Sequence, residues 1–181
     1  MIVEINVVGN DILRQPSVAV EPKPKAENSF IESLQATNVN SVWPDEVVSH
    51  IQDLKDTLMV NENGIGLASN QIWKDEETSP LRIFVIKALN ENKQQVIYEF
   101  INPRIVTSGK YIKVKESCLS VPNVEKVVKR KQNVTIEFQT LASTEKLRAK
   151  FDYDKHGIIP IVIQHEYDHL LGRLLVNELP V

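Results

Sequence analysis

The sequence contains a single cysteine, Cys118, and this scarcity excludes an internal disulfide. A small secreted fold stapled by disulfides is therefore excluded. A long apolar run is also lacking, because the longest strongly apolar stretch, residues 158–163, is far too short to cross a bilayer. The first ten residues lack the basic and then apolar pattern of a secretory signal. We therefore expect a cytoplasmic protein without a membrane partner.

An excess of charge of one sign is missing as well. The 24 acidic and 21 basic residues leave a net charge of −3, which gives no electrostatic footprint for nucleic acid or for an anionic membrane. The densest basic stretch, residues 126–131, is typical of a solvated strand or loop. Hydrophobic residues make up 42% of the chain, enough for an ordinary globular core. We expect one domain spanning residues 1–181.

Two segments have helical patterns. Residues 20–44 are rich in helix-breaking residues and predict a surface loop with one helical turn around residues 30–34. The first helix follows this loop, and Pro44 suits its first turn. Apolar residues then recur at steps of three and four as far as Asn63-Gly64, which ends the pattern. The second helix is predicted for residues 157–171, with Pro160 in its first turn and Gly172 just past its end. Because this helix is apolar nearly all round, it should be buried.

Between the two helices the sequence favours a loop, at residues 64–67, followed by strands. β-Branched content and alternation predict strands at residues 82–88, 96–101, 111–115, 133–140 and 147–151. This order predicts an α+β fold, with mostly antiparallel sheets packed around a central buried helix that carries a His-Glu-x-x-His run.

That run is His165-Glu166-Tyr167-Asp168-His169. Residues four apart share a helix face, so two imidazoles can bind one metal ion, while Glu166 reaches a water beside it. A metal ion lowers the pKa of such a water, and a nearby carboxylate can take its proton and pass it to the leaving group. Two structural histidines are the alternative, but an apolar helix would bury them without partners at a heavy desolvation cost.

The third metal ligand distinguishes the classes of enzyme. A metzincin would need histidine where this chain has Leu175, and a thermolysin-like enzyme would need a glutamate on a later helix. Glu178 is the only acidic residue in the twelve that follow the run. An upstream donor is therefore expected, and Cys118 is the candidate, although a lone cysteine is more often a small buried hydrophobe.

Three separate runs together resemble peptide deformylase. The family's Gly-x-Gly-Leu-Ala-Ala-x-Gln motif corresponds to residues 64–71, its Glu-Gly-Cys-Leu-Ser motif to residues 116–120, and its Gln-His-Glu-x-Asp-His-Leu-x-Gly motif to residues 164–172. The third run is complete, whereas the first departs at Ser69 and the second at Ser117. Residues 11–16 are also similar to the family's N-terminal segment, and residues 20–43 look like a loop insertion relative to it.

The resemblance implies an enzyme that removes the N-formyl group from the formyl-methionine of newly made polypeptides and releases formate. It implies that Cys118, His165 and His169 bind one divalent metal ion, natively Fe²⁺, for which Ni²⁺, Co²⁺ or Zn²⁺ can substitute. Glu166 would be the general base and then the acid. The side chain of Gln71 and the backbone N–H of Leu119 would stabilise the oxyanion.

The resemblance also implies how the peptide binds. The substrate should pair like a β-strand with backbone around Ile65, Gly66, Glu116 and Ser117. The methionine side chain should enter a pocket lined by Ile158, Ile161 and Val162, and Arg130 should lie near the peptide. Without the family, Gly66 is simply a turn glycine, the apolar residues are core, and Arg130 is a solvated cation.

Two departures bear on function. Ser117 replaces a glycine and would be strained if its φ were positive, so we expect an ordinary strand conformation there. The chain has few residues after Gly172, so we expect a transient encounter with the ribosome without a C-terminal docking helix. A zinc endopeptidase is the alternative supported by the His-Glu-x-x-His run alone. A catalytically inactive deformylase-like binding protein is supported only by Ser117 and the insertion.

Overall fold

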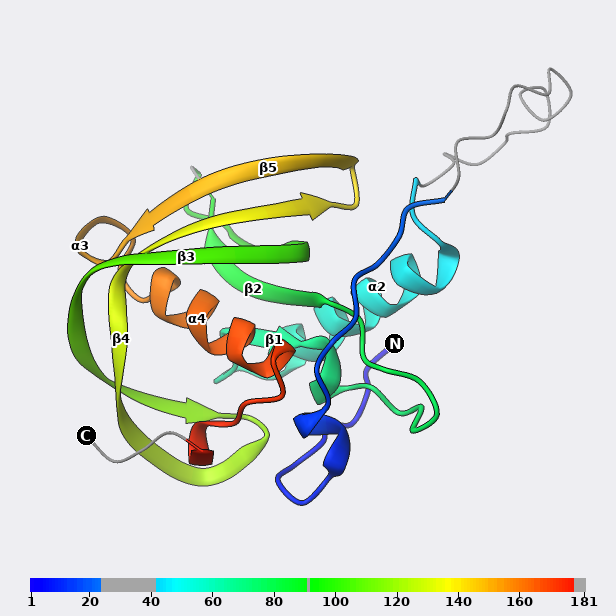
Figure 1. Ribbon diagram of the computed structural model, residues 1–181, viewed down its shortest axis with the longest axis horizontal. Helices are drawn as coiled ribbons and strands as arrows, with labels where there is room; N and C mark the ends of the chain where they lie inside the picture. The colour runs from blue at the N-terminus through cyan, green and yellow to red at the C-terminus, as the bar shows by residue number, and fades with distance from the viewer. Residues whose placement is uncertain (24–41, 91, 178–181) are drawn as a thin grey trace, which may run out of the picture.

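The computed structural model describes residues 1–23, 42–90 and 92–177 (Figure 1). Most of the loop expected at residues 20–43, with its helical turn around residues 30–34, lies outside the described residues. Within the described part, no helix is both long enough and apolar enough to span a bilayer.

The described strands form one antiparallel sheet in the order β1-β2-β3-β4-β5. Figure 1 shows β3 and β4 curving around helix α4 (Ile159–Leu170). Together with a small number of helices, this sheet gives a mixed α/β architecture, as the sequence predicts. The strand bounds are β1 Gly66–Ala68, β2 Ile83–Leu89, β3 Gln95–Cys118, β4 Val121–Thr140 and β5 Ser143–Asp152.

Several strands differ from the predicted ones. Residues 96–101 and 111–115 belong to the single strand β3, and residues 126–131 and 133–140 belong to β4. The pairing of β3 with β4 shifts register after Ile101, after Ser108 and after Ser117. Such bulges bend a strand without ending it, so Pro103 and Gly109 stay inside β3. The expected loop at residues 64–67 contains the start of β1, whose three residues pair with β2.

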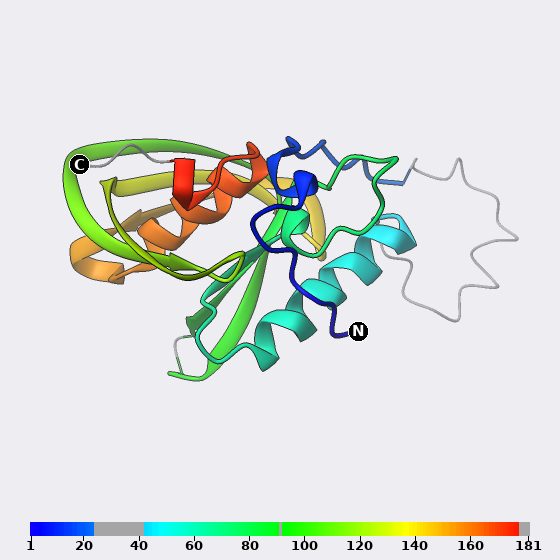
Figure 2. The same ribbon diagram turned by 90° about the horizontal axis from the view of Figure 1, so that it is seen from below.

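Strand β2 separates the two main helices. Its residues Ile83 and Val85 share a core with helix α2 (Asp45–Val60), whereas Phe84 and Ile86 share a core with α4. Figure 2 shows β2 between the two helices. Successive strand residues point to opposite faces, so a strand covered on both faces is a continuous apolar run. This explains the sequence Ile-Phe-Val-Ile at residues 83–86.

Helix α2 confirms the first helical prediction. Pro44 is its N-cap and Asn61 its C-cap. The predicted stripe of apolar residues is the buried face, and it packs with Trp43 and Leu67 in the first core; its members are Val47, Ile51, Leu54 and Leu58.

Helix α4 begins later than predicted. Residues Tyr153–His156 form a separate short helix, α3, and Gly157 follows with φ of +56°. This conformation cannot continue a right-handed helix, so α4 starts at Ile159. Gly172 has φ of +69° just past the helix, and a side chain there would collide with the backbone of Arg14. The helix end therefore docks against the N-terminal segment.

The side chain of His50 on α2 gives a testable pH dependence. Its Nε2 lies 2.8 Å from Ser69 Oγ, and burial lowers the pKa of His50 to about 4, with Asp53 opposing the shift. Between pH 6.5 and 4 the unfolded chain gains a proton at His50 that the folded chain does not. The free energy of unfolding therefore includes the full contribution of His50 above pH 6.5. As the pH falls from 6.5 to 4, this contribution is lost and the free energy of unfolding decreases by about 3 kcal/mol.

Urea unfolding of the parent and of His50→Gln at pH 7 and pH 4.5 measures this contribution. The variant should lose less stability than the parent over this interval, while the exposed-histidine control His156→Gln should behave like the parent. Equal losses in the parent and in His50→Gln would contradict the assignment.

Candidate metal centre

Three candidate ligands converge at one point of the structure. One donor atom from each of Cys118, His165 and His169 lies within 4.8 Å of the others, and Cys118 Sγ is 3.2 Å from His169 Nε2. Cys118 is the last residue of β3. The pairing with β4 shifts register between the exposed Ser117 and Cys118, and the thiol of Cys118 is buried. The histidines come from α4, one turn apart.

These donors suit a transition metal ion. Thiolate and imidazole together favour zinc or iron rather than calcium or magnesium. Burial lowers the pKa of His169 well below its usual value, which keeps the imidazole in the neutral form that a ligand requires. Three protein donors also leave a coordination position open, as catalytic sites do.

A chain of charged groups lies behind His165. Its Nδ1 donates to Glu116 Oε2 at 2.8 Å, and Arg130 donates to both oxygens of Glu116, at 2.8 Å from Nε and 3.0 Å from Nη2. Arg130 also forms an ion pair with Asp168 on α4. Burial alone would raise the pKa of Glu116, but hydrogen bonds from His165 and Arg130 outweigh it and lower the pKa to about 2. An ionised Glu116 fixes the imidazole orientation and directs Nε2 to the metal position.

Replacing Arg130 with methionine should destabilise the protein by about 3–5 kcal/mol, because the buried carboxylate of Glu116 and the partly buried carboxylate of Asp168 would lose their shared guanidinium. The free energy of unfolding, measured with urea in the presence of a chelator, excludes any contribution from metal loss. The exposed Arg148→Met removes the same groups from β5 and should change stability by less than about 0.5 kcal/mol. A similar small change for Arg130→Met would contradict the role of this ion pair.

The carboxylate of Glu166 lies between α4 and β1. Its Oε2 has no hydrogen-bond partner within the described part of the chain. Burial raises the pKa of Glu166 to about 7, although the nearby His165 opposes the shift. A Cβ on Gly66 would lie 2.3 Å from Glu166 Oε1, so only glycine allows β1 to approach this carboxylate. A buried carboxylate with a pKa near neutrality can act as a general base.

Gln71 presents its amide N–H groups to the same region. The backbone N–H of Ala68 donates to Gln71 Oε1 at 2.8 Å, which leaves Nε2 directed at Ser120 Oγ, 3.0 Å away, and at Cys118 Sγ, 3.9 Å away. Asn70 donates to the backbone carbonyls of Leu13 and His169. The segment before Gln71 is thereby tied to the end of α4.

A cavity of about 200 Å³ opens beside these groups. All but two of the expected metal, catalytic and peptide-contacting residues line this cavity. The two exceptions, His169 and Arg130, are buried outside the lining. The expected residues that line it are Ile65, Gly66, Gln71, Glu116, Ser117, Cys118, Leu119, Ile158, Ile161, Val162, His165 and Glu166. The structure thus brings together three motifs that are about fifty residues apart in sequence.

The structure changes one sequence-based expectation, that of a solvated Arg130, and confirms another, the strand conformation of Ser117. Arg130 is not a solvated cation, because its guanidinium is buried in ion pairs with Glu116 and Asp168. Ser117 is paired with Glu125 in an ordinary strand and is not among the residues with positive φ, so it causes no backbone strain. Sequence reasoning missed Asn70 and Ser120 as supports for the site, although both lie inside the motifs.

Comparison with known proteins identifies the family and the fold of the chain. The family model for polypeptide deformylase matches residues 2–180. The chain is 31% identical to the peptide deformylase of Karelsulcia muelleri (strain GWSS), over 99% of this chain and 79% of that protein. It is similar to the structure of a probable peptide deformylase from Synechococcus phage S-SSM7, with a TM-score of 0.73 and 26% identity over 98% and 99% of the two chains. It also shares its fold, with a TM-score of 0.72 and 23% identity over 99% of both chains, with the Met-Ala-Ser-bound peptide deformylase of Acinetobacter baumannii.

Proposed function

Because this chain belongs to the polypeptide deformylase family, we propose that Cys118, His165, His169, Glu166 and Gln71 form its active site. The enzyme is a hydrolase that removes the N-formyl group from newly synthesised polypeptides. The convergence of a Cys-His-His donor set with a buried carboxylate and an aimed amide around one cavity carries this proposal.

We propose Fe²⁺ as the native metal, with Ni²⁺, Co²⁺ or Zn²⁺ as substitutes, since a thiolate and two imidazoles suit all four ions. When bound, the metal lowers the pKa of water toward neutrality and polarises the formyl carbonyl. Glu116 and Arg130 hold His165 in the tautomer and direction that this ligand needs. Arg130 is therefore a positioning residue in this proposal.

Glu166 moves the proton. Its unpartnered Oε2 accepts a proton from the attacking water, whose oxygen then bonds to the formyl carbon. The same carboxyl group donates this proton to the peptide nitrogen as the carbon–nitrogen bond breaks, and formate and a free amino group result. A pKa of about 7 for Glu166 suits both halves of this transfer.

Gln71 and Leu119 stabilise the charge that develops on the formyl oxygen. The Nε2 of Gln71 is held by the bond from Ala68 to Oε1, and Leu119 follows the ligand Cys118 at the cavity wall. Donors fixed before the reaction cost no reorganisation during it, and each contributes roughly 3 kcal/mol in comparable sites.

The substrate pairs with the free edge of β1. Among the strands of the described residues, β1 is paired only with β2, so backbone groups around Ile65 and Gly66 can pair with an extended peptide, with Glu116 and Ser117 opposite. The methionine side chain enters between Ile158, Ile161 and Val162. The Acinetobacter baumannii protein binds Met-Ala-Ser, which supports a formyl-methionyl peptide as the substrate here.

At the level of the whole chain, we propose a single catalytic domain over residues 1–181, in which α4 is the central helix that carries the metal motif. Its substrates leave the ribosome in the cytoplasm, so we propose that the enzyme acts there through transient encounters. Residues 20–43 are proposed to be an insertion relative to the family.

Formate release from formyl-Met-Ala-Ser by protein loaded anaerobically with Fe²⁺, or with Ni²⁺, tests the function. Activity that depends on the metal is expected. Absence of formate release would favour the inactive binding protein, and cleavage of internal bonds in an acetylated peptide would favour the endopeptidase.

A further inference from the structure

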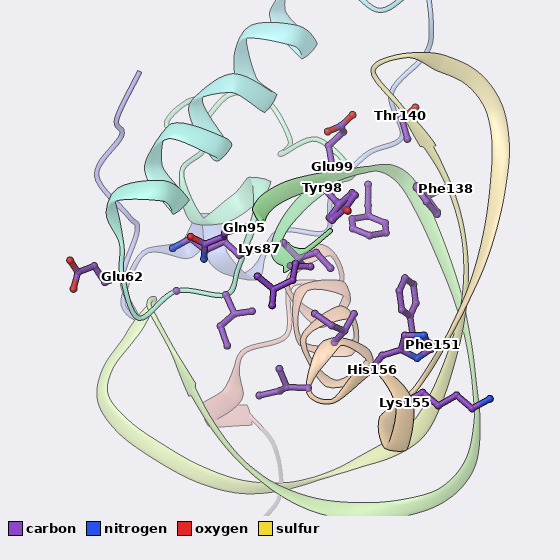
Figure 3. A pocket seen from close by; sticks show the side chains of 18 residues that line it. Glu62, Lys87, Gln95, Tyr98, Glu99, Phe138, Thr140, Phe151, Lys155 and His156 are labelled. Atoms are coloured by element: carbon purple, nitrogen blue, oxygen red, sulfur yellow. The ribbon is translucent and has the colours of Figure 1, made fainter. Parts of the chain in front are cut away.

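A second cavity, of about 860 Å³, adjoins the metal centre (Figure 3). Its volume is within the range of roughly 300–1,000 Å³ that small ligands occupy in proteins. Three of the five phenylalanines in the chain line it, and the rings of Phe100 and Phe138 are 4.6 Å apart. The apolar wall consists mainly of Ile86, Tyr98, Phe100, Phe138, Phe151 and Ile159.

The charged groups at this cavity are engaged elsewhere or turned outward. Lys87 donates from Nζ to the backbone oxygen of Asn61 at 2.8 Å, and Glu99 is paired with Lys55. In Figure 3, Glu62 and Lys155 lie at the edges, with their charged ends directed away from the centre. Among the described residues, the interior of this cavity consists of aromatic and aliphatic groups and no charged group points to its centre, which favours apolar ligands over charged ones.

The two cavities lie side by side and share part of their lining. Gly64, Ile65 and Ile158 line both of them. Ile65 is 38% exposed and Ile158 is 47% exposed, so large apolar side chains face solvent at the junction. A molecule that extends from the metal centre into the larger cavity would cover both.

The backbone gives this path a direction. Gly66 lies against Glu166, at the reacting end of the site. Beyond Gly66, residues Leu67 and Ala68 run into the buried core, so a peptide paired with β1 cannot leave that way. It must run antiparallel to β1, past Ile65 and then Gly64, which line the larger cavity. At about 3.3 Å per residue, the third to fifth residues of the substrate reach it.

We propose that the larger cavity binds apolar side chains at the third to fifth positions of the substrate. This proposal rests on the proposed function and adds a preference to it: nascent chains with aliphatic or aromatic residues shortly after the formyl-methionine are deformylated at lower concentration than chains with small or acidic residues there.

Steady-state kinetics with three formylated peptides tests the proposal. Formyl-Met-Ala-Ser reaches the cavity only with its third residue, a small serine, whereas formyl-Met-Ala-Ser-Phe-Leu and formyl-Met-Ala-Ser-Gly-Gly extend further into it with and without apolar side chains. We expect a KM about tenfold lower for the Phe-Leu peptide than for the Gly-Gly peptide, because partial burial of two apolar side chains supplies this factor.

Tyr98→Ser removes one aromatic side chain from the cavity wall. Because Tyr98 is 43% exposed, this substitution should disturb the core little. This variant should lose most of the preference for the Phe-Leu peptide. Val106→Ser, at a 62% exposed position of the same strand and outside the cavity lining, should keep it. If the parent protein does not hydrolyse formyl-Met-Ala-Ser, the proposed function itself is contradicted. Normal hydrolysis of that peptide, with equal KM values for the two pentapeptides or an unaltered preference in Tyr98→Ser, would sink only the role of the cavity.

Discussion

Replacing Glu166 with glutamine is expected to lower kcat/KM for formyl-Met-Ala-Ser by about a thousandfold while the metal content stays unchanged. Glutamine fills the same space against Gly66 but cannot accept the proton of the attacking water. Positioned proton transfer contributes on the order of 10²–10⁴ to such reactions. Glu166 follows the proposed ligand His165 in sequence but is not one of the three donors that cluster, so metal binding should survive.

The measurement pairs formate release with metal analysis of the same preparation. Glu145→Gln makes the same chemical change at an exposed position of β5 and should keep parental activity. If Glu166→Gln retained more than a tenth of parental kcat/KM, another group would have to be the base. If it lost the metal, Glu166 would have to be assigned a role in the ligand set.

Replacing Cys118 with serine is expected to weaken metal binding by roughly 100-fold or more, because a neutral hydroxyl is a far poorer ligand than a thiolate for a soft or borderline ion. Activity should fall below detection at metal concentrations that saturate the parent. The side chains are similar in size, so the metal-free variant should unfold at nearly the same urea concentration as the metal-free parent.

Equilibrium titration with Ni²⁺ or Zn²⁺, followed by dialysis and metal analysis, measures this effect. One tightly held ion per chain in Cys118→Ser would overturn the assignment of Cys118 as a ligand. Unfolding of the metal-free variant at a much lower urea concentration would show instead that Cys118 acts mainly as a buried apolar residue in its cluster with Val121 and Val128.

The sequence was most informative where chemistry depends on local spacing. His165 and His169 are four residues apart, so they share a face of α4 once this segment is helical. In α2, the apolar residues at steps of three and four specify which side of the helix is buried. Strand β3 was less predictable, because its bulges depend on pairing with β4 and no local pattern records them. Residues 66–68 became a strand only because β2 lies beside them.

Arg130 shows why residue type and position alone did not settle a role. An arginine in a basic stretch is usually solvated. The pairing of β3 with β4 brings Arg130 to Glu116, and the packing of α4 brings Asp168 to the same guanidinium. The larger cavity was also invisible in the sequence, because its wall is assembled from four strands and two helices. Its aromatic residues follow no shared motif.

The position of α4 within the curved sheet has a consequence for the order in which the protein assembles. Cys118 reaches its place when β3 and β4 pair, whereas two of the three metal donors arrive only when α4 docks. A partly folded chain without α4 therefore has one thiol and no complete ligand set. With the proposed ligands Cys118, His165 and His169, we expect high-affinity metal uptake to come late in folding, so that the ion stabilises only molecules whose last helix is in place. We therefore expect metal supply to favour completely folded molecules, separately from the role proposed for the metal in hydrolysis.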